Sequence, residues 1–404
     1  MEKKKKPAIR FKGFTDSWEQ RKLGELAEIV GGGTPSTSVE SYWDGDIDWY
    51  APAEIGEQIY LKSSQRKITE EGLNKSSAKV LPVGTVLFTS RAGIGKTAIL
   101  LKEGCTNQGF QSIVPNKDKL DSYFIFTRSE ELKRYGETVG AGSTFVEVSG
   151  KQMANMELMM PTIMDEQQKI GEYFSNLDHL ITLHQRKYDK LQIIKKSMLE
   201  KMFPQNGSCF PEIRFKGFTD SWEQRKLGDI ADVYDGIHQT PDYTDNGIMF
   251  LSVENINTLK SEKYISEEAF IRDYKVYPEK GDILMTRIGD VGTPNVVETT
   301  EKVAFYVSLA LLKPINVDSY FLCNSILSPF FQNGLKERTL VTAIPQKINK
   351  DEVGKVGLYL PTLIDEQREI GAFFQRLNNL ITLHQREVEK LQNIKKSMLE
   401  TMFV

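Results

Sequence analysis

Two short segments of the sequence place an arginine and glycines directly after an apolar run. They read TSRAGIGK at 89–96 and TRIGDVG at 286–292. An arginine can donate paired hydrogen bonds to guanine or bind phosphate, and glycines let a loop approach a ligand closely. We therefore predict that Arg91 and Arg287 contact DNA, with further candidates for the same surface at Thr89, Lys96, Thr286 and Asn295. The alternative is that these arginines brace their turns through backbone carbonyls.

Motifs that would make the chain an enzyme are incomplete. The segment 90–97 ends like a phosphate-binding P-loop, but Ser90 replaces the first required glycine. The segment GAGSTF at 140–145 lacks the third glycine of a dinucleotide fingerprint. Asp242, Asp273 and Lys275 loosely match a metal-dependent nuclease pattern that has no counterpart in the first half. No Pro-Pro pair occurs, although an adenine methyltransferase needs one, so we expect no catalytic centre and no bound metal or cofactor.

The chain repeats itself at its seams. The segment IRFKGFTDSWEQRKLG occupies 9–24 and again 213–228 without change. A second segment begins at Pro161 and recurs from Pro361, with 28 of its 43 residues unchanged. The blocks between them, 25–160 and 229–360, share little. Drift alone should not spare sixteen consecutive residues beside scrambled neighbours, so we interpret the blocks as two modules of one kind with different targets.

Each repeated tail predicts a long helix with a seven-residue apolar seam. The seam residues are Ile170, Leu177, His184, Leu191 and Met198, and in the second copy Ile370, Leu377, His384, Leu391 and Met398. We expect the two seams to pack antiparallel, with the variable blocks at opposite ends about a pseudo-twofold axis. About 40 residues would give a rod of roughly 60 Å. The two histidines are interpreted as polar residues that fix the register rather than as metal ligands.

The variable blocks are typical of mixed α/β units, because short apolar runs alternate with Gly, Pro and Asp. Strands are predicted at 46–50 and 85–89, with counterparts at 248–251 and 282–286. The predicted division is a first globular domain at 1–160, a long helix at 161–203, a second domain at 204–360 and a second long helix at 361–404. The two globular domains would thus be separated by two antiparallel coiled-coil helices.

Bulk composition limits the class of protein. The chain has 404 residues, 40% of them hydrophobic, and no apolar run of membrane-spanning length. Its three cysteines, Cys105, Cys209 and Cys323, are far apart, which favours a reducing cytoplasm over a disulfide framework. The net charge of −3 argues against a protein that coats DNA by itself. Either its basic surface is local or partner subunits supply most phosphate contacts.

The repeated head, the segment FTSRAGIGKTA, the pair Asn107-Gln108 and the tail PTIMDEQQKIGEYFSNLDHLI together resemble specificity subunits of type I restriction–modification systems. The resemblance covers nearly the whole chain, twice. It implies two target recognition domains that each read one half of a split site in double-stranded DNA. It also implies long helices that space these domains and dock two methyltransferase subunits, and a restriction subunit that can join. Those partners would use S-adenosylmethionine for adenine N6 methylation, and ATP and Mg for translocation and restriction.

Two other classes of function stay open from the sequence. A free-standing nuclease or nucleotide-dependent enzyme would need the motifs that are incomplete here. A coiled-coil scaffold without a nucleic-acid role would have no reason to diversify its globular blocks within identical seams. We therefore expect a non-catalytic, DNA-reading subunit.

Overall fold

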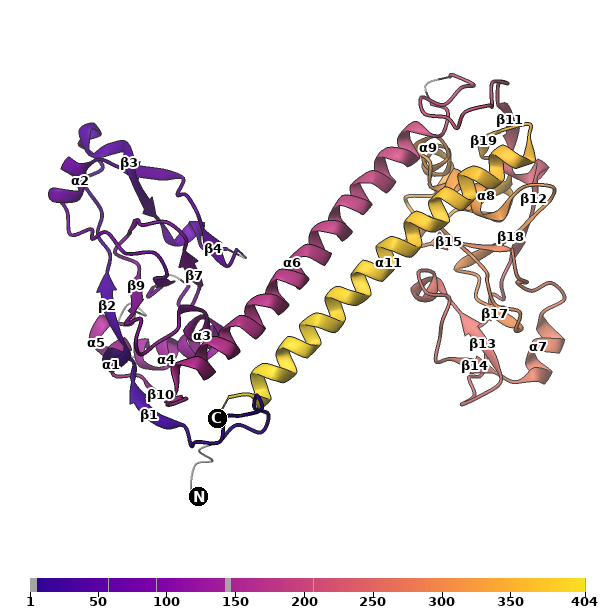
Figure 1. The fold of residues 1–404 in the computed structure, drawn as a ribbon. Helices are drawn as coiled ribbons and strands as arrows, with labels where there is room; N and C mark the ends of the chain where they lie inside the picture. Colours follow the sequence, from indigo (N-terminus) through magenta and orange to yellow (C-terminus); the bar gives the residue numbers. More distant parts are fainter. Residues whose placement is uncertain (1–5, 57, 92, 142–146, 206, 404) are drawn as a thin grey trace. The chain divides into compact units, whose positions relative to one another are not determined.

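Two long helices run through the repeated tails, α6 over Met164–Lys201 and α11 over Ile364–Thr401 (Figure 1). The computed structural model describes residues 6–56, 58–91, 93–141, 147–205 and 207–403. The chain divides into a first unit of Met1–His184 with Glu387–Val404 and a second unit of Gln185–Arg386. Each unit therefore combines one variable block with part of both long helices.

The described part of the first unit contains several short helices and three sheets, of which the two larger ones have five and three strands. A five-stranded sheet has the order β2 (Ala27–Gly31), β9 (Gln111–Pro115), β6 (Val86–Phe88), β7 (Thr97–Leu100) and β4 (Tyr60–Leu61). A three-stranded sheet has the order β5 (Arg66–Ile68), β3 (Trp43–Tyr50) and β8 (Cys105–Thr106). The helices are α1 (Leu23–Leu26), α2 (Glu70–Asn74), α3 (Ser122–Thr127), α4 (Ser129–Gly140) and α5 (Gly150–Ala154).

The second unit repeats this topology, except that its described residues form no counterpart of β4. One sheet has the order β12 (Ala231–Asp235), β18 (Leu309–Pro314), β15 (Ile283–Ile288) and β16 (Asp290–Val296). The other has the order β14 (Tyr264–Ile265), β13 (Ile248–Leu251) and β17 (Val303–Phe305). The helices are α7 (Glu267–Asp273), α8 (Ser319–Leu327), α9 (Pro329–Arg338) and α10 (Lys350–Gly354).

The mixed α/β class and the strand correspondence predicted from sequence are confirmed. The predicted run 85–89 contains β6, whose side chains are all buried, and its counterpart 282–286 contains most of β15. The strand β3 pairs in parallel with β8, and β13 does the same with β17. A short apolar run buried on both faces is typical of an interior strand, so unlike sequences can specify one arrangement.

The repeated segments close each unit. Strand β1 (Glu19–Lys22) in the head pairs antiparallel with β10 (Glu157–Met160), just before the first tail. Strand β11 (Glu223–Lys226) pairs in the same way with β19 (Gly357–Leu360). The head is therefore paired with the strand that leads directly into the tail, although about 140 residues separate the two strands in the sequence.

A buried glutamate in the first turn of each long helix holds the head. Glu166 accepts two hydrogen bonds from the Arg10 guanidinium, at 2.6 and 2.7 Å, and one from Trp18 Nε1 at 3.3 Å. Glu366 accepts the same set from Arg214, at 2.7 and 2.8 Å, and from Trp222 at 3.2 Å. Bidentate arginine–carboxylate pairs are geometrically specific. This clamp explains why the head and the tail are retained together.

The tail ends are exchanged between the units. In the first unit, the Phe403 ring at the end of the second tail lies against Trp18, Phe124 and Phe174, with centroids 5.7–6.1 Å apart. In the second unit, Phe203 at the end of the first tail lies against Trp222, Phe321 and Phe374 at 5.7–6.0 Å. Each aromatic core is thus completed by the tail that follows the other variable block.

The predicted antiparallel helix packing is confirmed within each unit. Phe174 of α6 meets Phe403, and Asp178, one turn further on, meets Lys395, which lies earlier in α11. Of the predicted seam, Ile170, Leu177, Ile370 and Leu377 are buried, and the remaining members are partly buried: His184, Leu191, Met198, His384, Leu391 and Met398. Among the described residues, no helix is long and apolar enough to cross a membrane.

Candidate nucleic-acid interface

The hairpins that carry the predicted DNA contacts are locked by a threonine. The Thr89 hydroxyl donates to the Gly93 carbonyl at 2.7 Å and accepts from the Lys96 backbone N–H at 2.9 Å. The Thr286 hydroxyl accepts from the Thr293 N–H, also seven residues on, at 2.9 Å. Both threonines are fully buried. The prediction that they lie on an exposed face is therefore wrong, because their hydroxyls close the turn.

Backbone hydrogen bonds show that Arg91 and Arg287 do not occupy equivalent positions. Ser90 donates to the Gly109 carbonyl and accepts from the Val148 N–H, at 2.8 and 3.0 Å. Arg287 makes the matching pair with Ser308 and Ile348, at 2.9 and 3.0 Å. Ser90 therefore corresponds to Arg287, and Arg91 to Ile288. A shift of one residue along a strand moves a side chain to the opposite face.

Arg287 braces the interior of the second unit. Its side chain is 6% exposed and donates to the Ile348 carbonyl at 2.9 Å, while Asp235 lies 3.1 Å away. Burial lowers the pKa of this guanidinium, and Asp235 opposes the shift. The prediction that Arg287 faces outward toward DNA is wrong, and the bracing alternative describes it. Asn295 also braces, since its amide donates to the Ile256 carbonyl at 2.8 Å.

Arg91 and Lys96 lie at the surface. Arg91 is partly exposed and Lys96 is exposed. The Arg91 Nε atom would lie 3.6 Å from a Cβ placed on Gly109, so the guanidinium lies over the turn before β9. Of the six predicted DNA contacts, Arg91, Lys96 and Asn295 are at least partly exposed, and the amide of Asn295 is bonded to a backbone carbonyl.

Two glycines in the hairpins serve packing rather than ligand approach. Gly95 and Gly292 have φ of +97° and +96°, which favours glycine. A Cβ at Gly95 would lie 2.3 Å from Lys133 in α4, and one at Gly292 would lie 2.6 Å from Leu335 in α9. The glycines therefore allow a helix to pack on each hairpin. The hairpin also excludes a P-loop, because 90–97 leads into strand β7 rather than a helix.

Polar side chains of the turn before β9 gather beside Arg91. The Asn107 amide donates to the Thr34 hydroxyl at 3.0 Å and its oxygen accepts from the Gly109 N–H at 2.8 Å. Thr34 in turn donates to the exposed Gln108. The sequence contained a signal for this site, because Asn107-Gln108 belongs to the segment that carries the family resemblance, but we did not predict these residues as DNA contacts.

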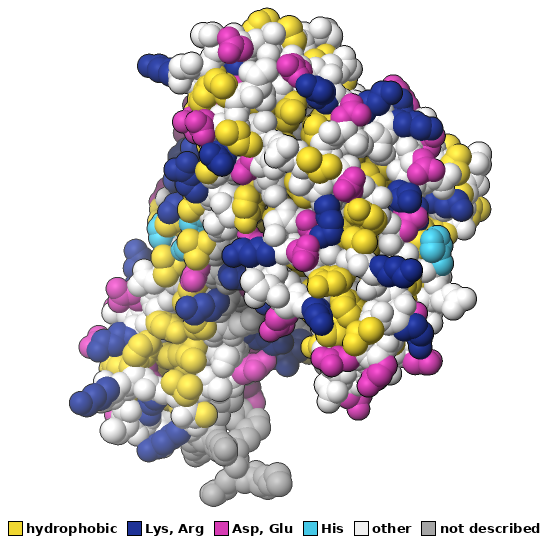
Figure 2. Space-filling view, turned by 90° about the vertical axis from the view of Figure 1, so that its right-hand side faces the viewer, with side chains coloured by type: hydrophobic (Ala, Val, Ile, Leu, Met, Phe, Trp, Pro, Cys, Tyr) yellow, Lys and Arg dark blue, Asp and Glu magenta, His cyan; other side chains and the backbone are white. Residues whose placement is uncertain are grey.

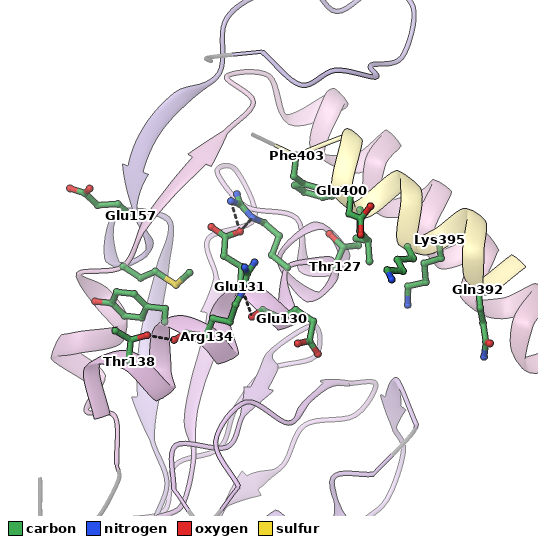
Figure 3. A pocket seen from close by; sticks show the side chains of 15 residues that line it. Thr127, Glu130, Glu131, Arg134, Thr138, Glu157, Gln392, Lys395, Glu400 and Phe403 are labelled. Atoms are coloured by element: carbon green, nitrogen blue, oxygen red, sulfur yellow. Dashed lines mark hydrogen bonds and ion pairs between the residues drawn. The ribbon is translucent and has the colours of Figure 1, made fainter. Parts of the chain in front are cut away.

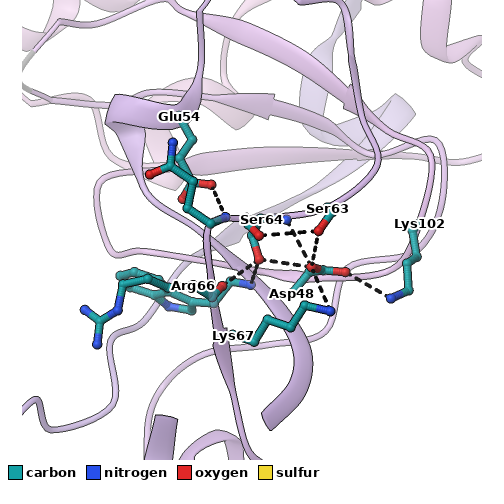
Figure 4. A network of polar contacts seen from close by, with 9 residues as sticks. Asp48, Glu54, Ser63, Ser64, Arg66, Lys67 and Lys102 are labelled. Carbon is teal, nitrogen blue, oxygen red and sulfur yellow. Dashed lines mark hydrogen bonds and ion pairs between the residues drawn. The ribbon is translucent and has the colours of Figure 1, made fainter. Parts of the chain in front are cut away.

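A second group of cations surrounds the buried Asp48 of β3 (Figure 4). Its carboxylate accepts from the Ser64 N–H at 3.0 Å and from Lys102 at 3.1 Å, and Lys67 lies 3.7 Å away. Burial alone would raise the pKa of Asp48, but these hydrogen bonds outweigh it and leave the pKa below its ordinary value. Arg66 stacks over the Trp43 ring at 3.6 Å. Strand β5 and the segment after β7 therefore bring Lys67 and Lys102 together around one buried carboxylate, with Arg66 next to Lys67 in the strand.

The pocket in Figure 3 lies between α4 and the end of α11 in the first unit and has a volume of about 910 Å³. Arg128, 3% exposed, pairs there with Glu131 at 2.7 Å.

Within the described ranges, no three His, Cys, Asp or Glu side chains are placed to hold a metal. The nuclease candidate Asp273 pairs with Arg272 at 2.8 Å, and residues 142–145 of the dinucleotide candidate lie outside the described residues.

Charge is mixed over the face in Figure 2. Lysines and arginines are interspersed there with acidic side chains and do not form one basic patch. The net charge of the chain is −3. Nonspecific DNA binding depends on phosphate neutralisation, so this face does not offer a continuous basic track.

These features define a class of protein with two mixed α/β domains of one topology. The exposed turns of the two domains differ in sequence, and both domains share the long helices. A family model described as Type I restriction modification DNA specificity domain matches the chain twice, at residues 15–192 and 219–393. Because the two matches cover most of the sequence, the chain belongs to the type I restriction modification DNA specificity family.

Individual relatives agree with this assignment. The type I restriction enzyme MjaIX specificity subunit of Methanocaldococcus jannaschii is 33% identical over 286 residues, which are 66% of this chain and 65% of that relative. The MjaVIII specificity subunit of the same organism is 20% identical over 402 residues, 96% of this chain and 92% of that relative. The crystal structure of a type I S subunit from M. genitalium has the same fold, with a TM-score of 0.63, 14% identity and 99% coverage of both chains.

Proposed function

We propose that the chain is the DNA sequence-specificity subunit of a type I restriction–modification complex and has no catalytic centre of its own. Each unit reads one half of a split site in double-stranded DNA. The observation that carries this proposal is one topology built twice, with identical seams and different side chains on the exposed turns. Two copies of a reading domain that differ at their surfaces can bind two different half-sites.

Under this proposal the helices dock two methyltransferase subunits, and restriction subunits can join. An identical segment, LITLHQR, supports equal docking sites at 180–186 and 380–386. It leaves Leu180 and Leu183 41% and 38% exposed in the first unit, and Leu380 and Leu383 45% and 51% exposed in the second. Exposed apolar groups on a helix are typical of interaction surfaces. S-adenosylmethionine, ATP and magnesium would belong to the partners, and the complex would act on cytoplasmic DNA.

A block exchange tests the proposal. The chain is expressed with its methyltransferase partner, and methylated adenines are mapped across the genome. We expect one split motif, and we expect replacement of residues 25–160 by the block of a relative to change one half only. A change in both halves, or methylation without any split motif, would contradict the proposal.

A further inference from the structure

Four polar residues of the first unit converge on one exposed turn. Thr34 follows β2, Arg91 follows β6, and Asn107 and Gln108 lie between β8 and β9. Gln108 is exposed, and the other three are partly buried. The Asn107 amide donates to the Thr34 hydroxyl, and this hydroxyl donates to the side-chain carbonyl of Gln108. The two hydrogen bonds therefore fix the position of the Gln108 carbonyl. No other described side chain bonds its amide nitrogen.

The turn itself is rigid. Asn107 caps it by accepting from the Gly109 N–H, and the Asn107 N–H donates to the Tyr50 carbonyl at 2.9 Å. Gly109 is buried, and a Cβ there would lie 3.0 Å from Pro52 and 3.2 Å from the Asn107 amide. Side chains on such a backbone are positioned before a ligand arrives, which reduces the entropic cost of binding.

The second unit has the same turn with different side chains. The Gly33 N–H donates to the Thr106 carbonyl at 2.8 Å, and the Ile237 N–H donates to the Phe305 carbonyl at 3.3 Å. Gly33 therefore corresponds to Ile237, and the next residue, Thr34, corresponds to His238. The Tyr306 N–H donates to the Leu251 carbonyl at 2.8 Å, so Tyr306 corresponds to Asn107. The buried Val307 takes the place of the exposed Gln108, and the partly exposed Ile288 takes that of Arg91.

We propose that this turn is the base-reading element of each unit, an inference that rests on the proposed function. In the first unit, the Arg91 guanidinium and the Gln108 amide present donors and an acceptor suited to the edges of guanine and adenine. In the second unit, the exposed imidazole of His238 and the apolar side chain of Ile288 take over, and the apolar group suits a thymine methyl. The different half-sites follow from these substitutions on one scaffold.

Other surface groups fit the role of reader less well. The lysines around Asp48 are single point charges, which suit phosphate and carry no base preference. Thr89, Thr286 and Arg287 are buried, and the Asn295 amide is engaged by the Ile256 carbonyl. The turn is the place where exposed polar groups, a fixed backbone and divergence between matched positions occur together.

The test uses the full chain in complex with its methyltransferase partner. Gln108→Ala and Arg91→Lys are compared with Lys117→Ala, an exposed residue at the other end of β9. DNA affinity, the methylated motif and the melting temperature are measured for each. We expect Gln108→Ala to lower affinity for the parent site about 5- to 150-fold, the range that ~1–3 kcal/mol per base contact gives. It should also relax one position of the first half-site and leave melting and the second half-site unchanged.

Arg91→Lys keeps the charge but loses the paired donors. If Arg91 reads a base, this variant changes the motif, whereas a phosphate contact would leave the motif unchanged. His238→Ala should change the second half-site only. Weakening of all sequences alike by Gln108→Ala and His238→Ala, or an unchanged motif in every variant, would overturn the inference. Failure of the parent complex to give a split motif would instead contradict the proposed function.

Discussion

At the residue scale, the two arginine–glycine segments show that arginines with similar neighbours in the sequence can point in opposite directions. Arg91 lies one position beyond the residue that matches Arg287, so one guanidinium lies at the surface and the other inside. The sequence could predict a hairpin here. It could not predict the register, because that depends on long-range bonds to Val148 and Ile348.

Alanine substitution separates the two arginines. Arg287→Ala removes the bond to the Ile348 carbonyl and leaves Asp235 without its partner, so we expect the second unit to lose ~1–3 kcal/mol of unfolding free energy. Arg91→Ala should leave the melting temperature unchanged, because its side chain lies at the surface. Chemical denaturation of both variants measures this, and equal destabilisation would contradict the assignment.

Asp48 gives the first unit a dependence on acid. Its folded pKa lies below the ordinary value, so the ionised carboxylate stabilises the fold. This stability is present above about pH 4, the usual pKa of an aspartate, and is lost as the pH falls through the lower folded pKa. We expect Asp48→Asn to be less stable than the parent at pH 7, and the difference to shrink near pH 3.

Urea unfolding at the two pH values checks this prediction. The matched control is Asp118→Asn, which changes an exposed carboxylate after β9. A difference between the parent and Asp48→Asn that stays constant from pH 7 to pH 3 would show that the Asp48 charge does not contribute. The second unit has Met249 at the corresponding place in β13, so the effect should be confined to the first unit.

At the element scale, the sequence predicted the long helices and matched strands, because periodicity and buried runs are local signals. It did not predict the exchanged tail ends. Phe203 and Phe403 close two similar tails that both end in Met-Phe, and neither ending indicates which block its aromatic ring will meet. That choice follows from antiparallel packing, which makes the end of one helix lie beside the start of the other.

Substitution of these rings should act on the unit that receives them. Phe203 is buried in the second unit, so we expect Phe203→Ala to cost ~3–5 kcal/mol there. Phe403 is partly exposed, so Phe403→Ala should cost less and should act on the first unit. Hydrogen exchange resolves the location: Phe203→Ala should raise exchange around Trp222 and Phe374, and Phe403→Ala around Trp18 and Phe174. If each substitution instead raised hydrogen exchange in the block that precedes its own tail, this result would contradict the exchange of tail ends between the units.

An ion pair adds to the docking of the tail on the first unit. Asp178 accepts from Tyr123 at 2.8 Å and from Lys395 at 2.6 Å. In the second unit Asn378 stands where Asp178 would be, and burial lowers the pKa of Lys195, the counterpart of Lys395. The two docking sites are therefore alike in their aromatic rings and different in their charges.

At the scale of the whole molecule, two halves of the sequence contribute to each unit. The first unit takes its end of α11 from the second half, and the second unit takes its end of α6 from the first half. When each copy of a duplication completes the core of the other, the segments that form these contacts are retained, whereas the variable blocks can diverge. This accounts for identical heads and similar tails around dissimilar blocks more directly than uniform drift does.

Division of the chain after Phe203 tests this dependence. Fragment 1–203 alone lacks Met402 and Phe403, and fragment 204–404 lacks Met202 and Phe203, so each leaves an aromatic core incomplete. We expect the co-expressed fragments to form a stable complex with the parent's melting behaviour, and we expect Phe203→Ala together with Phe403→Ala to weaken it. Native mass spectrometry measures the assembly. Homodimers of either fragment would also agree with the exchange of tail ends. Both tails end in Met-Phe, so the tail of one copy could complete the aromatic core of the other. Folded monomers as stable as the parent would contradict it, since each block would then complete its core with its own residues.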